Sequence, residues 1–99
     1  MEYTRKSTEG LGGALSILRE RLRQSDVENW TPEHDDKYTE GQLIRAAMAY
    51  ASGTILFWPE DWDKGWFKPT DEIRNLEKAG ALIAAEIDRL KRLENGKNI

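Results

Sequence analysis

The chain has 99 residues, no cysteine and a formal net charge of -3 from 15 basic and 18 acidic residues. This length provides for one domain with a modest core, and the lack of cysteine excludes a disulfide framework and a thiolate metal site. The weak negative charge disfavours binding to an extended nucleic acid, and no segment holds the roughly 20 apolar residues that a membrane span needs. The first residues contain no apolar run, so we expect no signal peptide and a cytoplasmic protein.

Residues 1–10 are polar and are expected to form a flexible N-terminal arm. Three leucines follow at the spacing of one helix face: Leu15, Leu18 and Leu22. They predict a first helix over about residues 12–24, with these leucines on its apolar face. The charged side chains of this helix are expected to point away from the apolar face: Arg19, Glu20, Arg21 and Arg23.

Thr39 and Gln42 have the spacing of a capping box, in which the Thr39 hydroxyl accepts a hydrogen bond from the Gln42 amide. We therefore expect a second helix to begin there and to end near Gly53. Its apolar positions recur at helical spacing: Leu43, Ala46, Ala47, Tyr50 and Ala51. The run of alanines allows another helix to approach closely.

Pro69 and Thr70 predict the start of a third helix, with Thr70 as the N-cap and acidic residues in the first turn. Its predicted apolar stripe is Ile73, Leu76, Ala79 or Gly80, Ile83, Ile87, Leu90 and Leu93. Asn95 and Gly96 predict the end of the helix, so residues 95–99 are expected to be a loose tail. This helix of about 24 residues, roughly 36 Å, is longer than the second one. We therefore expect a homo-oligomer in which a second copy of the chain covers the distal part of the stripe.

Together these segments predict an all-α fold with a three-helix core, in a single helical domain over residues 11–94. A Trp-rich loop or short helical turns are expected to connect the second and third helices. Residues 54–58, "TILFW", have strand propensity but no partner strand.

Residues 30–36 and 58–63 each carry a Pro-Glu-x-x-Asp sequence after a tryptophan. A structural interpretation is that proline occupies the first position of a helical turn and the acidic residues complement its exposed amides. The alternative is a divalent metal site, to which the two segments could contribute oxygen ligands and one imidazole: Glu33, His34, Asp35, Asp36, Glu60, Asp61 and Asp63. Four of these acidic residues form the metal set of an enzymatic interpretation: Glu33, Asp36, Glu60 and Asp63. His34 is the only histidine, and it is interpreted as a loop anchor or as a general base. A metallophosphohydrolase set would need a second histidine.

Four tryptophans are many for a chain with 38% hydrophobic content, and residues 58–66 contain Trp58, Trp62 and Trp66. Large aromatic side chains are seldom completely buried, so we expect part of this aromatic surface to be exposed. Exposed tryptophan beside charged groups is typical of a protein hot spot or of a base-stacking pocket. The predicted ligand or partner site comprises Trp30, Glu33, His34, Asp35, Asp36, Trp58, Trp62, Lys64, Trp66 and Lys68.

Several stretches, among them "WTPEHDD" at 30–36, "WPEDWDKGWFKP" at 58–69 and "KAGALIAAEIDRL" at 78–90, resemble a small family of phage and prophage accessory proteins. The resemblance covers roughly residues 18–93. The chain differs at Asn29, where the family has glycine, and at Tyr38, where it has histidine. The resemblance implies a phage origin, the cytoplasm of a bacterial host and an accessory role, and it carries over no catalytic residue.

The sequence lacks a nucleophile beside a base and a complete metal set, whereas tryptophan is in surplus. We therefore interpret the chain as a non-catalytic binding protein without a cofactor, which sequesters a small nucleotide ligand or covers a host protein. Such a protein would act on host defence or host machinery. The alternative is an all-α, Mg-dependent nucleotide pyrophosphohydrolase that uses Glu33, Asp36, Glu60 and Asp63.

Overall fold

The computed structural model describes residues 10–97, which form four α-helices, two 3-10 turns and no strand. In chain order these are α2 (Gly12–Asp26), α3 (Pro32–Asp36), α4 (Gln42–Ser52), η1 (Ile55–Phe57), η2 (Lys64–Trp66) and α5 (Glu72–Lys97). The predicted all-α fold is confirmed, and the Trp-rich segment between α4 and α5 contains short helical turns as expected. The N-terminal arm expected over residues 1–10 lies outside the described residues except for Gly10. None of the described helices is long and apolar enough to cross a lipid bilayer.

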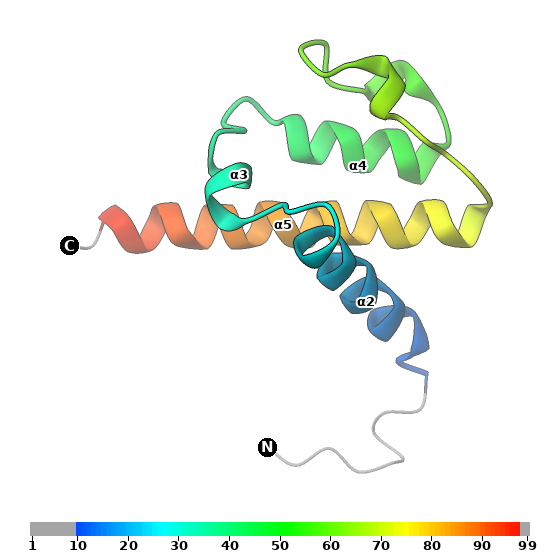
Figure 1. Ribbon diagram of the computed structural model, residues 1–99, viewed down its shortest axis with the longest axis horizontal. Helices are drawn as coiled ribbons and strands as arrows, with labels where there is room; N and C mark the ends of the chain where they lie inside the picture. Colours follow the sequence, from blue (N-terminus) through cyan, green and yellow to red (C-terminus); the bar gives the residue numbers. More distant parts are fainter. Residues whose placement is uncertain (1–9, 98–99) are drawn as a thin grey trace.

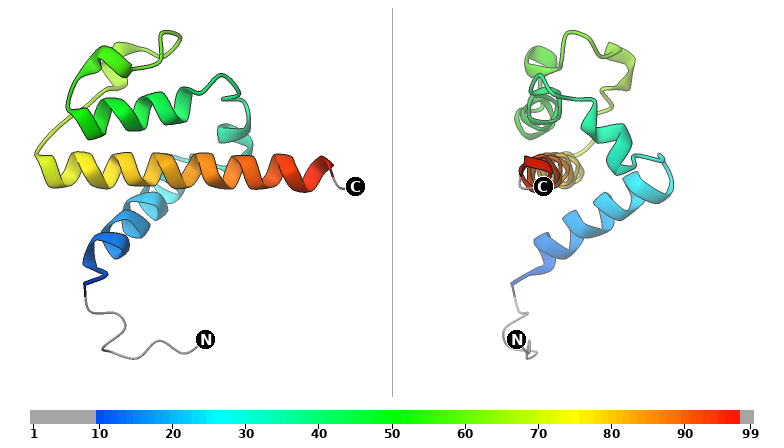
Figure 2. Two further views of the ribbon diagram at one scale, coloured as in Figure 1. Left: turned by 180° about the vertical axis from the view of Figure 1, so that it is seen from behind. Right: turned by 90° about the vertical axis from the view of Figure 1, so that its left-hand side faces the viewer.

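The long helix α5 is the axis of the fold, with α4 antiparallel to it and α2 crossing it (Figure 1). Helices α2 and α4 lie on different sides of α5 (Figure 2). The core lies mainly between α4 and α5: Leu43, Ala46, Ala47, Ala49, Tyr50, Trp58, Ala79, Leu82 and Ala85. Alanines on both helices allow their backbones to approach, as the sequence of α4 predicts.

Helix α4 begins differently from the prediction. Gly41 precedes it with a φ of 79°, in the left-handed region that suits glycine. The Gln42 side chain does not cap through Thr39: its Oε1 accepts a hydrogen bond from the Glu40 amide at 2.7 Å. Its Nε2 donates to the Asp61 carboxylate at 3.1 Å. The predicted capping box is therefore wrong, and Gln42 instead ties the start of α4 to the Trp-rich segment.

The loop expected between the first two long helices contains the short helix α3. Thr31 caps it, because the Thr31 hydroxyl accepts a hydrogen bond from the His34 amide at 3.2 Å, and Pro32 occupies its first turn. The structural interpretation of this Pro-Glu segment is confirmed. The predicted end of α4 at Gly53 is also confirmed.

Both ends of α5 differ slightly from the prediction. The Asp71 carboxylate, not the Thr70 hydroxyl, accepts the hydrogen bond of the Arg74 amide, at 2.8 Å, so the cap lies one residue later. The helix continues through Asn95 and Gly96 to Lys97, so positions 95–97 are helical rather than part of a loose tail. Residues 98–99 of that tail lie outside the described residues.

The aliphatic stripes predicted for α2 and α5 do not form the core. The three leucines predicted for α2 are about half exposed, and the buried residues of α2 are Glu20 and Gln24. On α5, Ala79 belongs to the buried side, whereas the large aliphatic positions of the predicted stripe are about half exposed or more: Ile73, Leu76, Ile83, Ile87, Leu90 and Leu93. Helix α4 packs on the small-residue side of α5, where the backbones can approach, so the larger side chains remain on an outer face.

Helices α2 and α5 cross at Gly80. A Cβ added at this glycine would lie 2.5 Å from Cδ1 and 3.1 Å from Cγ2 of Ile17. Isoleucine is branched at Cβ and stiff at χ1, so it cannot turn both branches away. Because Gly80 has no side chain, Ile17 of α2 can pack directly on the backbone of α5.

Gly80→Ala is expected to lower the free energy of unfolding by about 1 to 2 kcal/mol, because the strain of overpacking exceeds the gain in helix propensity. Urea unfolding followed by circular dichroism measures this change. Gly13→Ala is the matched control, since Gly13 is also helical and a Cβ there meets no atom within 4 Å. The packing explanation is contradicted if both substitutions stabilise the protein.

Candidate ligand-binding pocket

A pocket of about 370 Å³ opens between the end of α2, α3, the Trp-rich segment and α5. Its volume is in the range of small-molecule sites. Its aromatic and imidazole lining consists of Trp30, His34, Tyr38, Tyr50, Trp58, Trp62 and Trp66. Its charged lining consists of Arg23, Lys37, Lys68, Lys78, Glu20 and Glu28. The remaining lining residues are Gln24, Leu43 and Leu82.

The aromatic lining forms a continuous series of ring contacts. Trp30 stacks on His34 with 5.7 Å between ring centroids and 3° between ring planes. The His34 ring meets Tyr38 edge-on at 5.3 Å, and Tyr38 contacts Trp62 at 4.8 Å. Trp62 also contacts Trp66 at 6.1 Å. These contacts join α3 to the Trp-rich segment and fix the aromatic wall of the pocket.

The expectation that the tryptophans cannot all be buried is confirmed. Trp66 is 57% exposed, whereas Trp58 is 6% exposed and belongs to the core. Trp30 and Trp62 are partly buried. Trp58 is anchored because its Nε1 donates to the Asp63 carbonyl at 3.1 Å. Three of the four indoles therefore present some surface to solvent or ligand.

His34 is held by a fully buried carboxylate. Asp35 is 0% exposed, and its Oδ1 lies 3.0 Å from His34 Nδ1, while its Oδ2 accepts a hydrogen bond from Arg21 at 2.8 Å. This pair fixes the imidazole ring in its stacked position on Trp30. Asp35 thus positions a pocket residue without lining the pocket itself.

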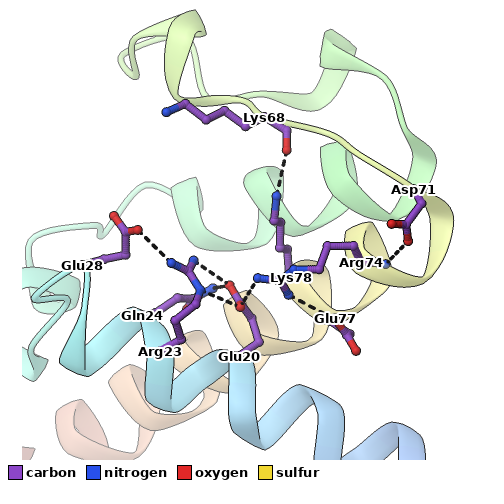
Figure 3. Close-up of polar contacts among 9 residues, drawn as sticks. All are labelled: Glu20, Arg23, Gln24, Glu28, Lys68, Asp71, Arg74, Glu77 and Lys78. Atoms are coloured by element: carbon purple, nitrogen blue, oxygen red, sulfur yellow. Dashed lines mark hydrogen bonds and ion pairs between the residues drawn. The ribbon is translucent and has the colours of Figure 1, made fainter.

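A second buried carboxylate, Glu20, lines the pocket and lies where residues of α2 meet α5 (Figure 3). It accepts hydrogen bonds from Arg23 at 2.9 and 3.0 Å, from Gln24 at 3.2 Å and from Arg74 of α5. Burial by itself raises the pKa of Glu20, but the hydrogen bonds from Arg23 and Arg74 outweigh it and lower the pKa to about 2. Glu20 is therefore ionised at neutral pH, and its charge is matched by two arginines.

Lys78 projects from α5 toward the Trp-rich segment, and its Nζ donates to the Lys68 carbonyl at 2.8 Å (Figure 3). The Lys68 amide in turn donates to the Tyr50 hydroxyl at 3.1 Å. Burial, and then the positive charge of Arg74, lower the pKa of Lys78. Burial raises the pKa of Tyr50, which keeps its hydroxyl protonated.

Two buried polar atoms of pocket residues have no hydrogen-bond partner among residues 10–97: Gln24 Oε1 and Trp62 Nε1. A buried polar atom without a partner is costly and is uncommon in proteins. Gln24 Nε2 donates to Glu20, which fixes the amide so that its oxygen remains the free acceptor. The buried interior beside the pocket therefore contains one acceptor and one donor without a partner among the described residues.

Six of the ten site residues predicted from the sequence line the pocket: Trp30, His34, Trp58, Trp62, Trp66 and Lys68. The other four do not. Asp35 is buried beneath His34, and Asp36 pairs with Arg92 of α5 at 2.7 Å. Glu33 and Lys64 are exposed outside the pocket.

The four acidic residues of the metal interpretation are not brought together. Asp36 is engaged by Arg92, and the Asp63 carboxylate accepts the Gly65 amide at 2.7 Å. Over the described part of the chain, no three histidine or acidic side chains are grouped closely enough to hold a metal ion. The predicted set of Glu33, Asp36, Glu60 and Asp63 therefore does not form a common site.

Several pocket residues were not predicted from the sequence: Glu20, Arg23, Gln24, Lys37, Tyr38, Tyr50 and Lys78. Glu20 and Arg23 were expected to turn away from the apolar face of the first helix, which is correct, but that polar side faces the pocket. The only sequence signal is the spacing of Ile17, Glu20 and Gln24, which places one apolar and two polar residues on one helix face.

No protein-family model, curated protein or solved structure matches the chain.

Proposed function

We propose that the protein is a non-catalytic binding protein that sequesters a nucleotide-type ligand in this pocket. The observation that carries the proposal is the combination of a partly exposed aromatic wall with a surplus of positive charge. Four basic and two acidic side chains line the pocket, although the chain as a whole has a net charge of -3. Aromatic rings stack on nucleobases, and cationic side chains bind phosphate.

The composition of the pocket favours binding over chemistry. Its lining, as described over residues 10–97, contains no serine, threonine or cysteine that His34 could activate as a nucleophile. His34 is committed to Asp35 on one side and to the Trp30 ring on the other. These features support a site that holds its ligand unchanged.

The proposed context is a phage accessory protein that acts on host defence or host machinery in a bacterial cytoplasm. This part of the proposal depends on the resemblance described above. One local observation agrees with that resemblance: Asn29 has a φ of 59°, and the family has glycine at this position. Glycine and asparagine are the residues that tolerate the left-handed region best.

We also propose that the protein self-associates through the exposed aliphatic face of α5. Ile83, Ile87 and Leu90 follow the three-four spacing of a coiled-coil seam, and each is about half exposed. An apolar row of this kind is self-complementary in a two-fold dimer. Covering it with a second copy would remove these side chains from water.

Trp66→Ala is expected to weaken nucleotide binding by about tenfold, since base stacking on an indole contributes about 1 to 3 kcal/mol. The measurement is a titration of the purified protein with linear and cyclic nucleotides, followed by the quenching of tryptophan fluorescence and by calorimetry. Leu56→Ala is the matched control, because Leu56 is an exposed residue of the same connecting segment that does not line the pocket.

Two other results would replace the proposal. Release of pyrophosphate from a nucleoside triphosphate in the presence of magnesium would favour the pyrophosphohydrolase alternative. Failure of every nucleotide to bind, together with Trp66-dependent capture of one host protein, would favour a protein inhibitor.

A further inference from the structure

The lysines that line the pocket differ from Arg23 in whether a carboxylate pairs with their positive charge. Arg23 is bound to Glu20 and to Glu28, the latter at 2.8 Å. Within residues 10–97, no carboxylate lies within ion-pairing distance of Lys68 or Lys78, although both line the pocket. The positive charges available to a ligand are therefore those of the lysines.

Hydrogen bonds hold the Lys78 ammonium group and the backbone of Lys68 next to each other. Lys78 Nζ is tied to the Lys68 carbonyl, and the Lys68 amide is tied to the Tyr50 hydroxyl. Figure 3 shows Lys78 between Lys68 of the Trp-rich segment and Arg23 of α2, with the ammonium end of Lys68 turned away from that of Lys78. The third lining lysine, Lys37, lies elsewhere, with its Nζ 5.3 Å from the centroid of the Tyr38 ring.

An anion bound beside Lys78 would offset two effects that disfavour the charge of its ammonium group. Lys78 is partly buried near the guanidinium of Arg74, and both burial and that neighbouring charge lower its pKa. Glu20 cannot compensate fully, because its oxygens already accept hydrogen bonds from Arg23, Arg74 and Gln24. A phosphate is the anion that fits beside a base-stacking wall.

We infer that Lys68 and Lys78 form a phosphate subsite, and that the ligand is therefore a phosphorylated nucleotide rather than a nucleoside or a free base. This inference rests on the proposed function, because the aromatic wall must hold the base. The phosphate lies against the lysines and the base against Trp30, Trp62 and Trp66.

The test compares each nucleotide with its own dephosphorylated nucleoside by calorimetry, with inorganic phosphate as a further probe. The nucleotide is expected to bind at least about tenfold more tightly than its nucleoside. This advantage is expected to shrink as sodium chloride is raised, whereas nucleoside binding stays constant. Inorganic phosphate alone is expected to bind more weakly than the nucleotide.

Substitutions of the two lysines test whether they cause the tighter binding of the nucleotide. Lys78→Met is expected to remove most of the tenfold difference, because it lowers the affinity for the nucleotide far more than the affinity for the nucleoside. Lys68→Met is expected to act in the same direction, and its exposed side chain makes it the safer variant if Lys78→Met proves unstable on heating. Lys64→Met is the matched control, because Lys64 does not line the pocket.

Each outcome separates the inference from the proposed function. Equal affinities for nucleotide and nucleoside, or an advantage that survives both Lys68→Met and Lys78→Met, would overturn the phosphate subsite and leave a base-binding pocket in place. If neither nucleotide nor nucleoside binds, the proposed function fails and the inference fails with it. An advantage lost equally in Lys64→Met would show a general charge effect and would also overturn the subsite.

Discussion

Glu20→Gln is expected to lower the free energy of unfolding at neutral pH by roughly 3 kcal/mol. The magnitude follows from the pKa of Glu20, about 2 in the folded protein against 4.5 as its ordinary value, at about 1.4 kcal/mol for each unit. Glutamine keeps the shape of the side chain but leaves Arg23 and Arg74 without the charge that both contact. The variant therefore removes the electrostatic link between α2 and α5 without opening a large cavity.

The same residue predicts an acid dependence with a defined sign. Because folding lowers its pKa, ionised Glu20 stabilises the protein fully above about pH 4.5, and this stabilisation is lost as the pH falls toward about 2. Urea unfolding across this range is expected to show a smaller loss of stability in Glu20→Gln than in the unmodified chain. Glu72→Gln is the control, since Glu72 is exposed at the start of α5. Parallel pH profiles for Glu20→Gln and the unmodified chain contradict the assignment.

Ile87→Glu is expected to convert a self-associated protein into a monomer. The substitution places a charge in the middle of the exposed row on α5, where Ile87 is 47% exposed. An unpaired charge in an apolar interface is strongly unfavourable. In sedimentation velocity at micromolar concentration, the unmodified chain is expected to have the mass of at least a dimer, and the variant the 11.4 kDa of one chain.

Leu56→Glu controls for the addition of a charge to an exposed aliphatic residue. Leu56 is 80% exposed in η1, outside the row on α5, so its variant is expected to keep the mass of the assembly. A mass of 11.4 kDa for the unmodified chain would show that the outer face of α5 is not an interface between copies.

The features that the sequence predicted correctly are those determined by neighbouring residues. Pro32 occupies the first turn of α3, Gly53 ends α4 and the alanines of α4 pack closely, because turn residues and helix spacing act within a few positions. The incomplete burial of the tryptophans could also be predicted, since it depends on their number and size. Trp66 bears this out most clearly.

The features that it missed depend on contacts between distant residues. The apolar row of α5 is the stronger helical signal, yet the core uses the face with Ala79, Leu82 and Ala85, because small residues let α4 approach. An apolar row on one chain looks the same whether another helix or another copy covers it. Glu20 is buried because Arg74, 54 residues away, reaches it, and no local pattern encodes that pairing.

Some of the pocket residues could likewise be predicted from the sequence, and others could not. Its aromatic wall comes largely from two segments that could be recognised by composition, whereas Arg23 and Lys78 come from helices whose charged residues resemble an ordinary solvated surface. The four acidic residues of the predicted metal set are not brought together, because Asp36 and Asp63 have other partners. Asp36 pairs with α5, and Asp63 accepts the amide of Gly65 in η2.

The indole N–H signals of the four tryptophans in a nitrogen-15 correlation spectrum test the nucleotide pocket most directly. On addition of a binding nucleotide, the Trp62 signal is expected to move most, because its Nε1 lacks a partner. Trp30 and Trp66 are expected to shift through ring stacking, and Trp58, whose Nε1 is bound to the Asp63 carbonyl, is expected to move least. Four unchanged signals at saturating concentrations of every nucleotide would contradict the existence of such a site.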